Sequence, residues 1–364
     1  MSKLFTPLDL GGLELTNRIT VAPMCQYSAI DGSMTDWHLM HLGMLALSGA
    51  SMLVIEATAV TPEGRITPQD TGLYSDANEQ AMARVTRYVR SVSPIRLGIQ
   101  LSHAGRKASA ERPWEGRGAL SSDHGAWRTE APSAIPLAEG WPAPNELSRH
   151  DMERIKQAFA NAAKRAVRLG LDFVELHCTH GYLISEFLSP LANRREDEYG
   201  GNLENRMRYA LEVFDAVRIA IPAGTPVGAK ISGTDFAPGG WMPEDAVVFA
   251  RELKKRGCAY VTVSGGGVVL DAKVPVGPGY QVPYAEQVKR ETGITTGAVG
   301  LITEPAQAEE IVATGKADFV SLARGMLFNP RWGWHAALAL GAEAYYPPQY
   351  QRCAPKMWPG AKRT

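Results

Sequence analysis

The sequence predicts an α/β fold, a (β/α)8 TIM barrel, and three observations support this. Short apolar runs rich in β-branched residues recur eight times along the 364 residues, with helical patterns between them. Near-continuous hydrophobicity is typical of parallel strands that are covered on both faces. Eight strand-then-helix units in a chain of this length match such a barrel. The alternative, a doubly wound sheet, usually has GxGxxG after its first strand, where this chain reads "PMCQYS".

The expected elements follow one another in a regular order. Before the first strand, "FTPLDLGGLELTNR" predicts a small N-terminal hairpin over the bottom of the barrel. Two helices have clear limits: the helix at 148–170 begins at the capping residue Ser148 and ends at Gly170, and the helix at 243–257 has proline in its first turn and glycine at its end. The eight strands are expected at residues 18–23, 51–58, 95–102, 171–177, 226–232, 258–265, 294–299 and 317–323.

One long insertion interrupts this order. Residues 103–150, rich in Gly, Pro, Trp and Ser, lie between the third and fourth expected strands. A loop of this length in a compact domain is usually functional, for example as a lid over an active site. We therefore expect residues 1–364 to form a single barrel domain, with 103–150 as a capping insertion.

Composition and charge narrow the classes of protein. Lysine plus arginine and aspartate plus glutamate number 38 each, and a formal net charge of zero gives no support to a nucleic-acid partner. No run has the length of a membrane span, and "MSKLFTPLDL" lacks the apolar core of a signal peptide. Cys25, Cys178, Cys258 and Cys353 form no CxxC pair and are expected to be reduced thiols. The sequence thus predicts a cytoplasmic enzyme without a nucleic-acid or membrane partner.

The fourth strand ends in an unusual group of side chains, "HCTHGY". Chemistry in a barrel lies where strands end, and His177, His180 and Tyr182 follow this strand. The two histidines either cap the strand end by bonding backbone carbonyls or act as a pair of donors aimed at one oxygen. In the second case they would polarise a carbonyl or nitro group, with Tyr182 as a general acid. A metal site is a weaker interpretation, because one HxxH lacks a third ligand and Glu175 is expected on the opposite face of the strand.

Other strand ends carry residues suited to an anionic ligand. "SGGGVV", "TGAVGLIT" and "ARG" place glycines and Arg324 after the last three strands, and the loops after strands seven and eight often bind phosphate in barrels. Lys230 closes the fifth strand, where a buried lysine needs a counter-charge. Cys25 is either a small buried hydrophobe or a nucleophile, although no activating base stands beside it. The third strand ends in a further polar group, Gln100, His103, Arg106 and Lys107. Of these residues, the glycines and Arg324 after the last three strands lead us to expect a phosphate-bearing cofactor.

These residues lie in longer motifs that are recognisable. They include "LFTPLDLGGLELTNRITVAPMCQYS", "EATAVTPEGRIT", "IQLSHAGRKAS", "HGYLISEFLSPLANRREDEYGGNLENRMRY", "GYQVPYAEQVK", "TGAVGLIT" and "PPQYQR". With these motifs the chain resembles the old yellow enzyme family, in particular its short bacterial, thermophilic-like branch with a cysteine near the flavin. The resemblance covers essentially the whole chain, and the stretch that begins at His180 is its most specific part.

The resemblance implies an FMN-dependent ene-reductase, which takes hydride from NADPH or NADH and passes it from flavin N5 to Cβ of an activated C=C bond. Tyr182 would then protonate Cα, while His177 and His180 bind the substrate oxygen. Cys25 would tune the flavin potential, and Arg324 would hold the FMN phosphate. The positions matched to non-covalent FMN binding are Ala22, Pro23, Met24, Cys25, Ala57, Gln100, His177, Lys230, Gly300, Ala323 and Arg324.

The resemblance also implies an assembly of several subunits. Tyr27 would line the substrate pocket, and Trp358 would shape the pocket or an interface. Arg352 matches an arginine that reaches into a neighbouring subunit's active site in this branch, so the tail 345–364 is expected to cross to a partner. A homodimer or homotetramer follows from this.

Three departures from the family pattern stand out. Lys230 replaces the usual arginine beside the flavin, which keeps the charge but loses the planar fork of donors, so we expect weaker FMN retention or a shifted potential. "HCTH" replaces "HAAH", and the favoured interpretation of Cys178 and Thr179 is a local change of packing. Ala323 replaces a common glycine before Arg324, where its backbone N–H would still serve.

Alternative functions differ in observable properties. A flavin dehydrogenase or dienoyl-CoA reductase would add an iron–sulfur cysteine cluster and a nucleotide domain, and this sequence contains neither. A flavin-free hydrolase or aldolase would use Lys230 as a Schiff base, or the histidines with a metal. A third alternative is a flavin-storage protein. Colour separates the hydrolase from the others, and turnover separates storage from catalysis.

Overall fold

The barrel predicted from the sequence is present, and it is closed. The computed structural model describes residues 2–116, 118–358 and 360–361. Its parallel strands are hydrogen-bonded in the order β10–β11–β12–β3–β4–β5–β8–β9, and each overlaps one of the eight expected strands, so the fold class is confirmed. The strands are β3 (Ile19–Val21), β4 (Met52–Ala59), β5 (Arg96–Ser102), β8 (Phe173–Cys178), β9 (Val227–Ser232), β10 (Val261–Ser264), β11 (Thr296–Ala298) and β12 (Phe319–Leu322).

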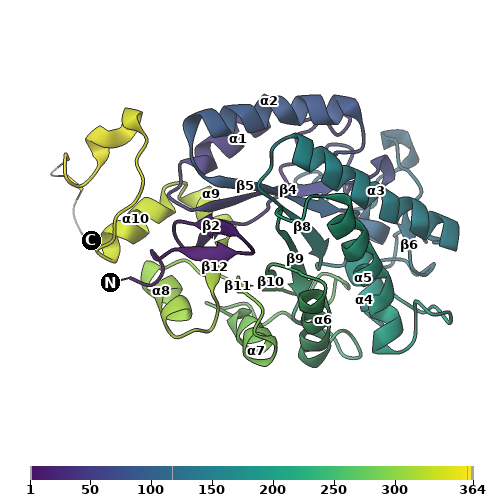
Figure 1. Cartoon of the computed structure of the whole chain (residues 1–364). Coiled ribbons are helices and arrows are strands. Elements are labelled where there is room, and N and C mark those ends of the chain that lie inside the picture. Colours follow the sequence, from purple (N-terminus) through teal and green to yellow (C-terminus); the bar gives the residue numbers. More distant parts are fainter. Residues whose placement is uncertain (1, 117, 359, 362–364) are drawn as a thin grey trace.

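Helices follow the strands and cover the outside of the barrel (Figure 1). The Ser148 hydroxyl accepts a hydrogen bond from the Asp151 N–H at 3.2 Å, and Gly170 has the left-handed φ of 71°, so both predicted limits of this helix are confirmed. The helices are α1 (Asp36–Ala46), α2 (Asp76–Val92), α3 (Arg149–Arg168), α4 (Leu183–Leu188), α5 (Leu203–Ala220), α6 (Pro243–Lys255), α7 (Val282–Thr292), α8 (Pro305–Ala313), α9 (Arg324–Phe328) and α10 (Trp332–Ala339).

The remaining elements are short. The predicted hairpin is formed by two antiparallel strands, and the insertion contributes a parallel pair and two 3-10 turns. They are β1 (Leu8–Leu10), β2 (Leu13–Leu15), β6 (Glu130–Ala131), β7 (Asn145–Glu146), η1 (Pro62–Gly64), η2 (Gly105–Lys107), η3 (Ser122–His124) and η4 (Pro348–Cys353).

The bottom of the barrel is closed by aromatic rings and by the hairpin. Phe173, Tyr260 and Phe319 are fully buried and meet edge to face, with ring centres 6.2 and 5.7 Å apart. Each ring lies against a glycine of a neighbouring strand, where a Cβ atom would come within 2.3 Å of the ring. Leu10 and Leu15 of the hairpin pack on the same cluster. This end is a packed hydrophobic layer, which leaves the opposite end of the strands for chemistry.

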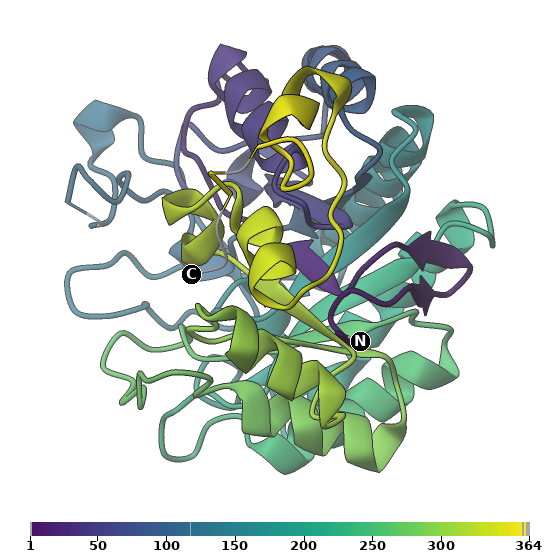
Figure 2. The ribbon, with the colours of Figure 1, turned by 90° about the vertical axis from the view of Figure 1, so that its left-hand side faces the viewer.

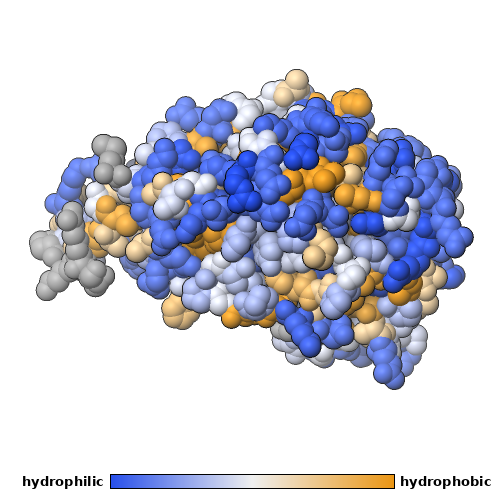
Figure 3. Space-filling view, turned by 90° about the horizontal axis from the view of Figure 1, so that it is seen from below, coloured by the Kyte–Doolittle hydropathy of each residue, from blue (hydrophilic) through white to orange (hydrophobic). Residues whose placement is uncertain are grey.

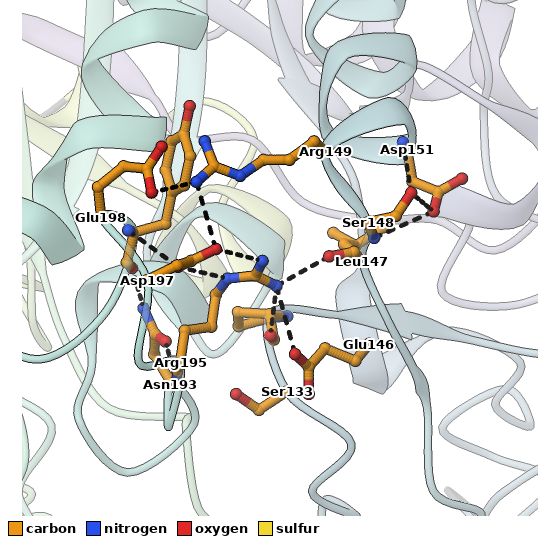
Figure 4. A network of polar contacts seen from close by, with 12 residues as sticks. Ser133, Glu146, Leu147, Ser148, Arg149, Asp151, Asn193, Arg195, Asp197 and Glu198 are labelled. Atoms are coloured by element: carbon orange, nitrogen blue, oxygen red, sulfur yellow. Dashed lines mark hydrogen bonds and ion pairs between the residues drawn. The ribbon is translucent and has the colours of Figure 1, made fainter.

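The insertion lies at that opposite end. In Figure 2 it projects at the left with the loop after β10, whereas the purple hairpin lies at the right. A polar network anchors it to the barrel (Figure 4). The Arg195 guanidinium donates to the backbone carbonyls of Pro132 and Leu147 at 3.0 and 2.8 Å and forms an ion pair with Asp197 at 2.7 Å. Because Pro132 follows β6 and Leu147 follows β7, one side chain ties both strands of the insertion to the segment after α4.

The tail packs on α10 and extends beyond it at the left of Figure 1. Trp334 stacks on Tyr346 with ring centres 4.5 Å apart, and the Arg331 guanidinium lies 4.8 Å from the Trp334 ring. On the face shown in Figure 3, hydrophilic residues cover most of the surface and hydrophobic ones occur in small groups. Within the described residues, no helix combines the length and the apolar character that crossing a bilayer requires.

Candidate active site

His177 lies in β8, and His180 lies in a tight left-handed turn directly after this strand, here called the histidine turn. His180 and Gly181 have φ values of 63° and 72°. A Cβ atom on Gly181 would lie 2.1 Å from the Gly267 carbonyl oxygen, so the loop after β10 presses against this turn and only glycine fits. The turn brings the rings together, since the centres of His177 and His180 are 5.1 Å apart and those of His177 and Tyr182 are 4.8 Å apart.

The surroundings keep both imidazoles neutral and the phenol protonated. Burial lowers the pKa of His177 and His180 well below 6.5, and the positive charges of Lys230 and Lys107 lower both further. The Thr179 N–H donates to His177 Nδ1 at 3.4 Å, so in the neutral ring Nε2 carries the proton. Burial raises the pKa of Tyr182 well above 10, so its hydroxyl keeps a proton to give.

The prediction that Glu175 faces away from the histidines is wrong. Side chains in a strand share a face at every second position, and Glu175 therefore points into the barrel like His177. The Gln100 side-chain amide donates to Glu175 Oε1 at 2.8 Å inside the barrel. Lys230 is the register neighbour of His177, and its charge acts to lower the pKa of Glu175, which burial raises. Glu175 thus supplies the counter-charge that the buried Lys230 was expected to need. Among the described residues, no group of three or more His, Cys, Asp or Glu converges to hold a metal.

A cavity of about 470 Å³ opens between the ends of β11, β12 and β3. This volume is in the usual range for a small-molecule site. Lys230 at its wall is buried and Arg324 is exposed, which suits a group with an electron-rich ring and a phosphate. Gly300, at φ 107°, leaves bare backbone in the wall, because a Cβ there would lie 3.0 Å from the Gln281 nitrogen. These residues fit FMN. The predicted site residues that line this cavity are Ala22, Pro23, His180, Lys230, Gly300, Ala323 and Arg324.

Other predicted site residues surround the histidine turn. The Ala57 backbone N–H donates a hydrogen bond to the Cys25 sulfur, but burial raises the pKa of this thiol well above 9, so the thiolate that a nucleophile needs is disfavoured. Cys25 and Tyr27 both raise the pKa of Tyr182 through their charged forms, which places them close to it. Tyr27 also meets Trp114 of the insertion edge to face, with ring centres 5.9 Å apart. Met24, next to Cys25, is partly buried against the core.

Some predicted residues lie elsewhere. Arg352 and Trp358 are exposed in the tail and do not line the cavity of their own chain. His103 is buried with its Nε2 3.5 Å from Glu130, within the insertion's base. Cys178 is packed in the hydrophobic core, and the Thr179 hydroxyl hydrogen-bonds that of Ser232 at 2.7 Å.

Sequence reasoning missed Ser264. Its hydroxyl lies 2.8 Å from His180 Nε2 and orients that ring. The sequence did contain an indication of its role, a polar residue at the last position of the sixth strand, but the interpretation of this segment considered only the three glycines that follow it. The buried Glu186 of α4 was also missed, because "LISEFL" is an apolar run in which a single carboxylate reads as an exposed side chain.

Comparison with known proteins identifies relatives of this chain. Residues 3–341 match the profile of the "NADH:flavin oxidoreductase / NADH oxidase family". The chain is 44% identical to the NADPH dehydrogenase of Geobacillus thermodenitrificans (strain NG80-2) over 351 residues, which cover 96% of this chain and 98% of that one. It is 42% identical to an NADH:flavin oxidoreductase of Gibberella zeae over 360 residues, covering 94% and 87%. The structure of morphinone reductase in complex with tetrahydroNAD has a TM-score of 0.76 and 27% identity, covering 96% of this chain and 94% of that one.

Proposed function

The chain belongs to the NADH:flavin oxidoreductase / NADH oxidase family and is a flavin-dependent NAD(P)H oxidoreductase that uses FMN, and on this premise we propose that it reduces activated C=C bonds. The family resemblance seen in the sequence is thereby confirmed. The substrates are α,β-unsaturated carbonyl compounds, maleimides and nitroalkenes. The observation that carries the proposal is a pair of neutral imidazoles in contact with a protonated phenol, with His180 of this group lining the cofactor cavity.

His177 and His180 bind the carbonyl or nitro oxygen of the substrate. Because both rings are neutral, each offers one N–H and can hold the oxygen without forming an ion pair in the ground state. Negative charge grows on this oxygen as the C=C bond is reduced, so the donors bind the transition state more strongly than the substrate. A fixed donor of this kind lowers the barrier by about 3–4 kcal/mol.

Tyr182 protonates Cα and completes the reduction. Its hydroxyl is beside His177 and retains its proton at neutral pH because burial raises its pKa. FMN, when bound, supplies the hydride that it takes from NADPH or NADH. Lys230, backed by Glu175 and Gln100, places a positive charge at the buried wall of the cavity, where it favours negative charge on the ring. Cys25, as a thiol, tunes the potential from the end of β3, and the Ala323–Arg324 segment holds the phosphate.

The visible spectrum under anaerobic conditions tests this function. The protein is expected to be yellow, to bleach on addition of NADPH and to recover its colour on addition of 2-cyclohexen-1-one. Bleaching without recovery would refute the substrate class and leave the oxidoreductase assignment intact. If excess nitroalkene also fails to restore the yellow colour, a flavin-storage role is favoured.

We propose in addition that the enzyme is a cytoplasmic homodimer or homotetramer in which Arg352 of one subunit completes the active site of the next. The exposure of Arg352 and Trp358 in the tail supports this. Light scattering gives the oligomeric state. Mixing a Tyr182→Phe chain with an Arg352→Ala chain would restore activity in part if the site is shared, and would not do so otherwise.

A further inference from the structure

Lys107 of η2 lies beside the histidine turn and is not one of the residues that line the cofactor cavity. Its Nζ donates to the carbonyl of His180 at 2.8 Å and to the carbonyl of Gly267 at 3.0 Å. The same Nζ lies 5.1 Å from the centre of the Tyr182 ring. One ammonium group therefore contacts the turn that carries both His180 and Tyr182 and also the loop that follows β10.

The turn needs such a contact because its backbone is strained and crowded. His180 is a non-glycine residue in the left-handed region, a conformation that persists only where the surroundings impose it. A Cβ atom on Gly267 would lie 2.6 Å from the His180 carbonyl oxygen, so the two segments are in direct backbone contact. Two carbonyl oxygens converge there, and a cation between them removes their repulsion. Ser264 orients the His180 ring, while Lys107 holds its backbone.

The charged residues next to Lys107 also bind the loop that follows β10 and the helix α4. Arg106 donates from its guanidinium to the Val268 carbonyl at 2.7 Å and from its backbone N–H to Glu186 Oε1 at 2.9 Å. Burial lowers the pKa of Lys107 to about 8, with Glu186 of α4 acting against this and Arg106 adding to it. Burial also raises the pKa of Glu186 to about 8. Two consecutive cations of η2 thus hold the loop after β10, and within the described residues Lys107 is the one of these two that also hydrogen-bonds the histidine turn.

We propose that Lys107 is a positioning residue for substrate reduction, which holds the His180 carbonyl and thereby sets the direction of the His180 ring and the Tyr182 hydroxyl. The inference rests on the proposed function, because the direction of these groups matters for a substrate whose oxygen they bind. A lysine suits this position, since a compact ammonium group donates to two carbonyls at once. A methionine of similar length would leave both carbonyls without a donor.

The test compares Lys107→Met holoenzyme with the wild type in two reactions of the dithionite-reduced protein. Oxygen needs no histidine pair, whereas 2-cyclohexen-1-one does. We expect the limiting rate of reoxidation by the enone to fall 10- to 100-fold in Lys107→Met, with reoxidation by oxygen within twofold of the wild type. Lys107→Arg, which keeps charge and donors, should recover most of the rate. Lys164→Met, at an exposed lysine of α3, serves as the matched control and should behave as the wild type.

Two further readouts separate positioning from damage to the fold. Phenol, whose oxygen accepts hydrogen bonds from the histidines, should bind oxidised Lys107→Met about tenfold more weakly by calorimetry. The wild-type enone step should decline as pH rises through about 8, because Lys107 loses its proton there; this decline should disappear in Lys107→Met and persist in Glu186→Gln.

The inference is overturned if Lys107→Met reacts with the enone and binds phenol as the wild type does, or if it slows enone and oxygen equally. A decline near pH 8 that vanishes in Glu186→Gln and remains in Lys107→Met would also overturn it. If the wild type reacts with oxygen but not with the enone, the proposed function fails instead, and phenol binding then decides alone whether Lys107 positions His180.

Discussion

Replacing Tyr182 by phenylalanine removes one hydroxyl and little else. The ring contact with His177 at 4.8 Å and the Lys107 ammonium at 5.1 Å from the ring both involve the ring rather than the oxygen, so the turn should keep its shape. Because burial raises the pKa of Tyr182 well above 10, the wild-type hydroxyl is protonated across the working pH range and its loss is the loss of the acid. General acid catalysis contributes about 10²–10⁴-fold, or about 2.7–5.4 kcal/mol of the barrier.

Stopped-flow absorbance measures this prediction in the two half-reactions separately. Reduction of Tyr182→Phe by NADPH should stay within threefold of the wild type, and oxidation of the reduced protein by 2-cyclohexen-1-one should slow by about 10²–10⁴-fold. Tyr209→Phe is the matched control, because it removes a buried hydroxyl that donates to the Met152 carbonyl at 3.0 Å and does not line the cofactor cavity. Equal slowing of both half-reactions in Tyr182→Phe, or no slowing of the enone step, would refute the assignment of Tyr182 as the acid.

Three further predictions concern the cofactor cavity, the insertion and a buried carboxyl group. Lys230→Arg should restore a planar fork of donors and lower the FMN dissociation constant about tenfold, as charge-assisted hydrogen bonds of about 1.5–3 kcal/mol allow; fluorescence titration measures it, and an unchanged constant together with an unchanged midpoint potential would contradict the idea. Arg195→Leu should destabilise the protein by about 2–4 kcal/mol and raise amide exchange at 130–147, because it removes the donors of Pro132 and Leu147. Burial raises the pKa of Asp70 from 3.8 to about 7, so between these values the unfolded chain releases a proton that the folded chain keeps, and stability falls as pH rises. Asp70→Asn should flatten this slope in urea titrations from pH 4 to 7, with a contribution of up to about 4 kcal/mol, and an unaltered slope would count against it.

The barrel could be predicted from the sequence because its signal is local. Each strand is covered on both faces, so the eight apolar runs are nearly continuous and stand out without knowledge of their partners. The cap at Ser148 and the hairpin before β3 are likewise written in a few adjacent residues. The motif around His180 identified the family for the same reason, since "HGYL" and the residues after it are contiguous. The structural role of these motifs could not be predicted in the same way. Arg195, the second arginine of "NRREDEYGG", holds the insertion in place through a contact between segments about 50 residues apart.

Only the tertiary structure decided which polar groups meet inside the barrel. Glu175 faces Lys230 and Gln100 because register brings three strands together, and register depends on pairing rather than on composition. Ser264 meets His180 across 84 positions, and Lys107 meets His180 across 73, through a left-handed turn pressed against the loop after β10. Hydrophobic patterning is a property of each segment, so the sequence determined the elements of this protein. The chemistry of its site depends on the directions in which the side chains at the strand ends point. These directions are set only when the barrel closes and brings strand ends that are distant in the sequence to the same end of the barrel.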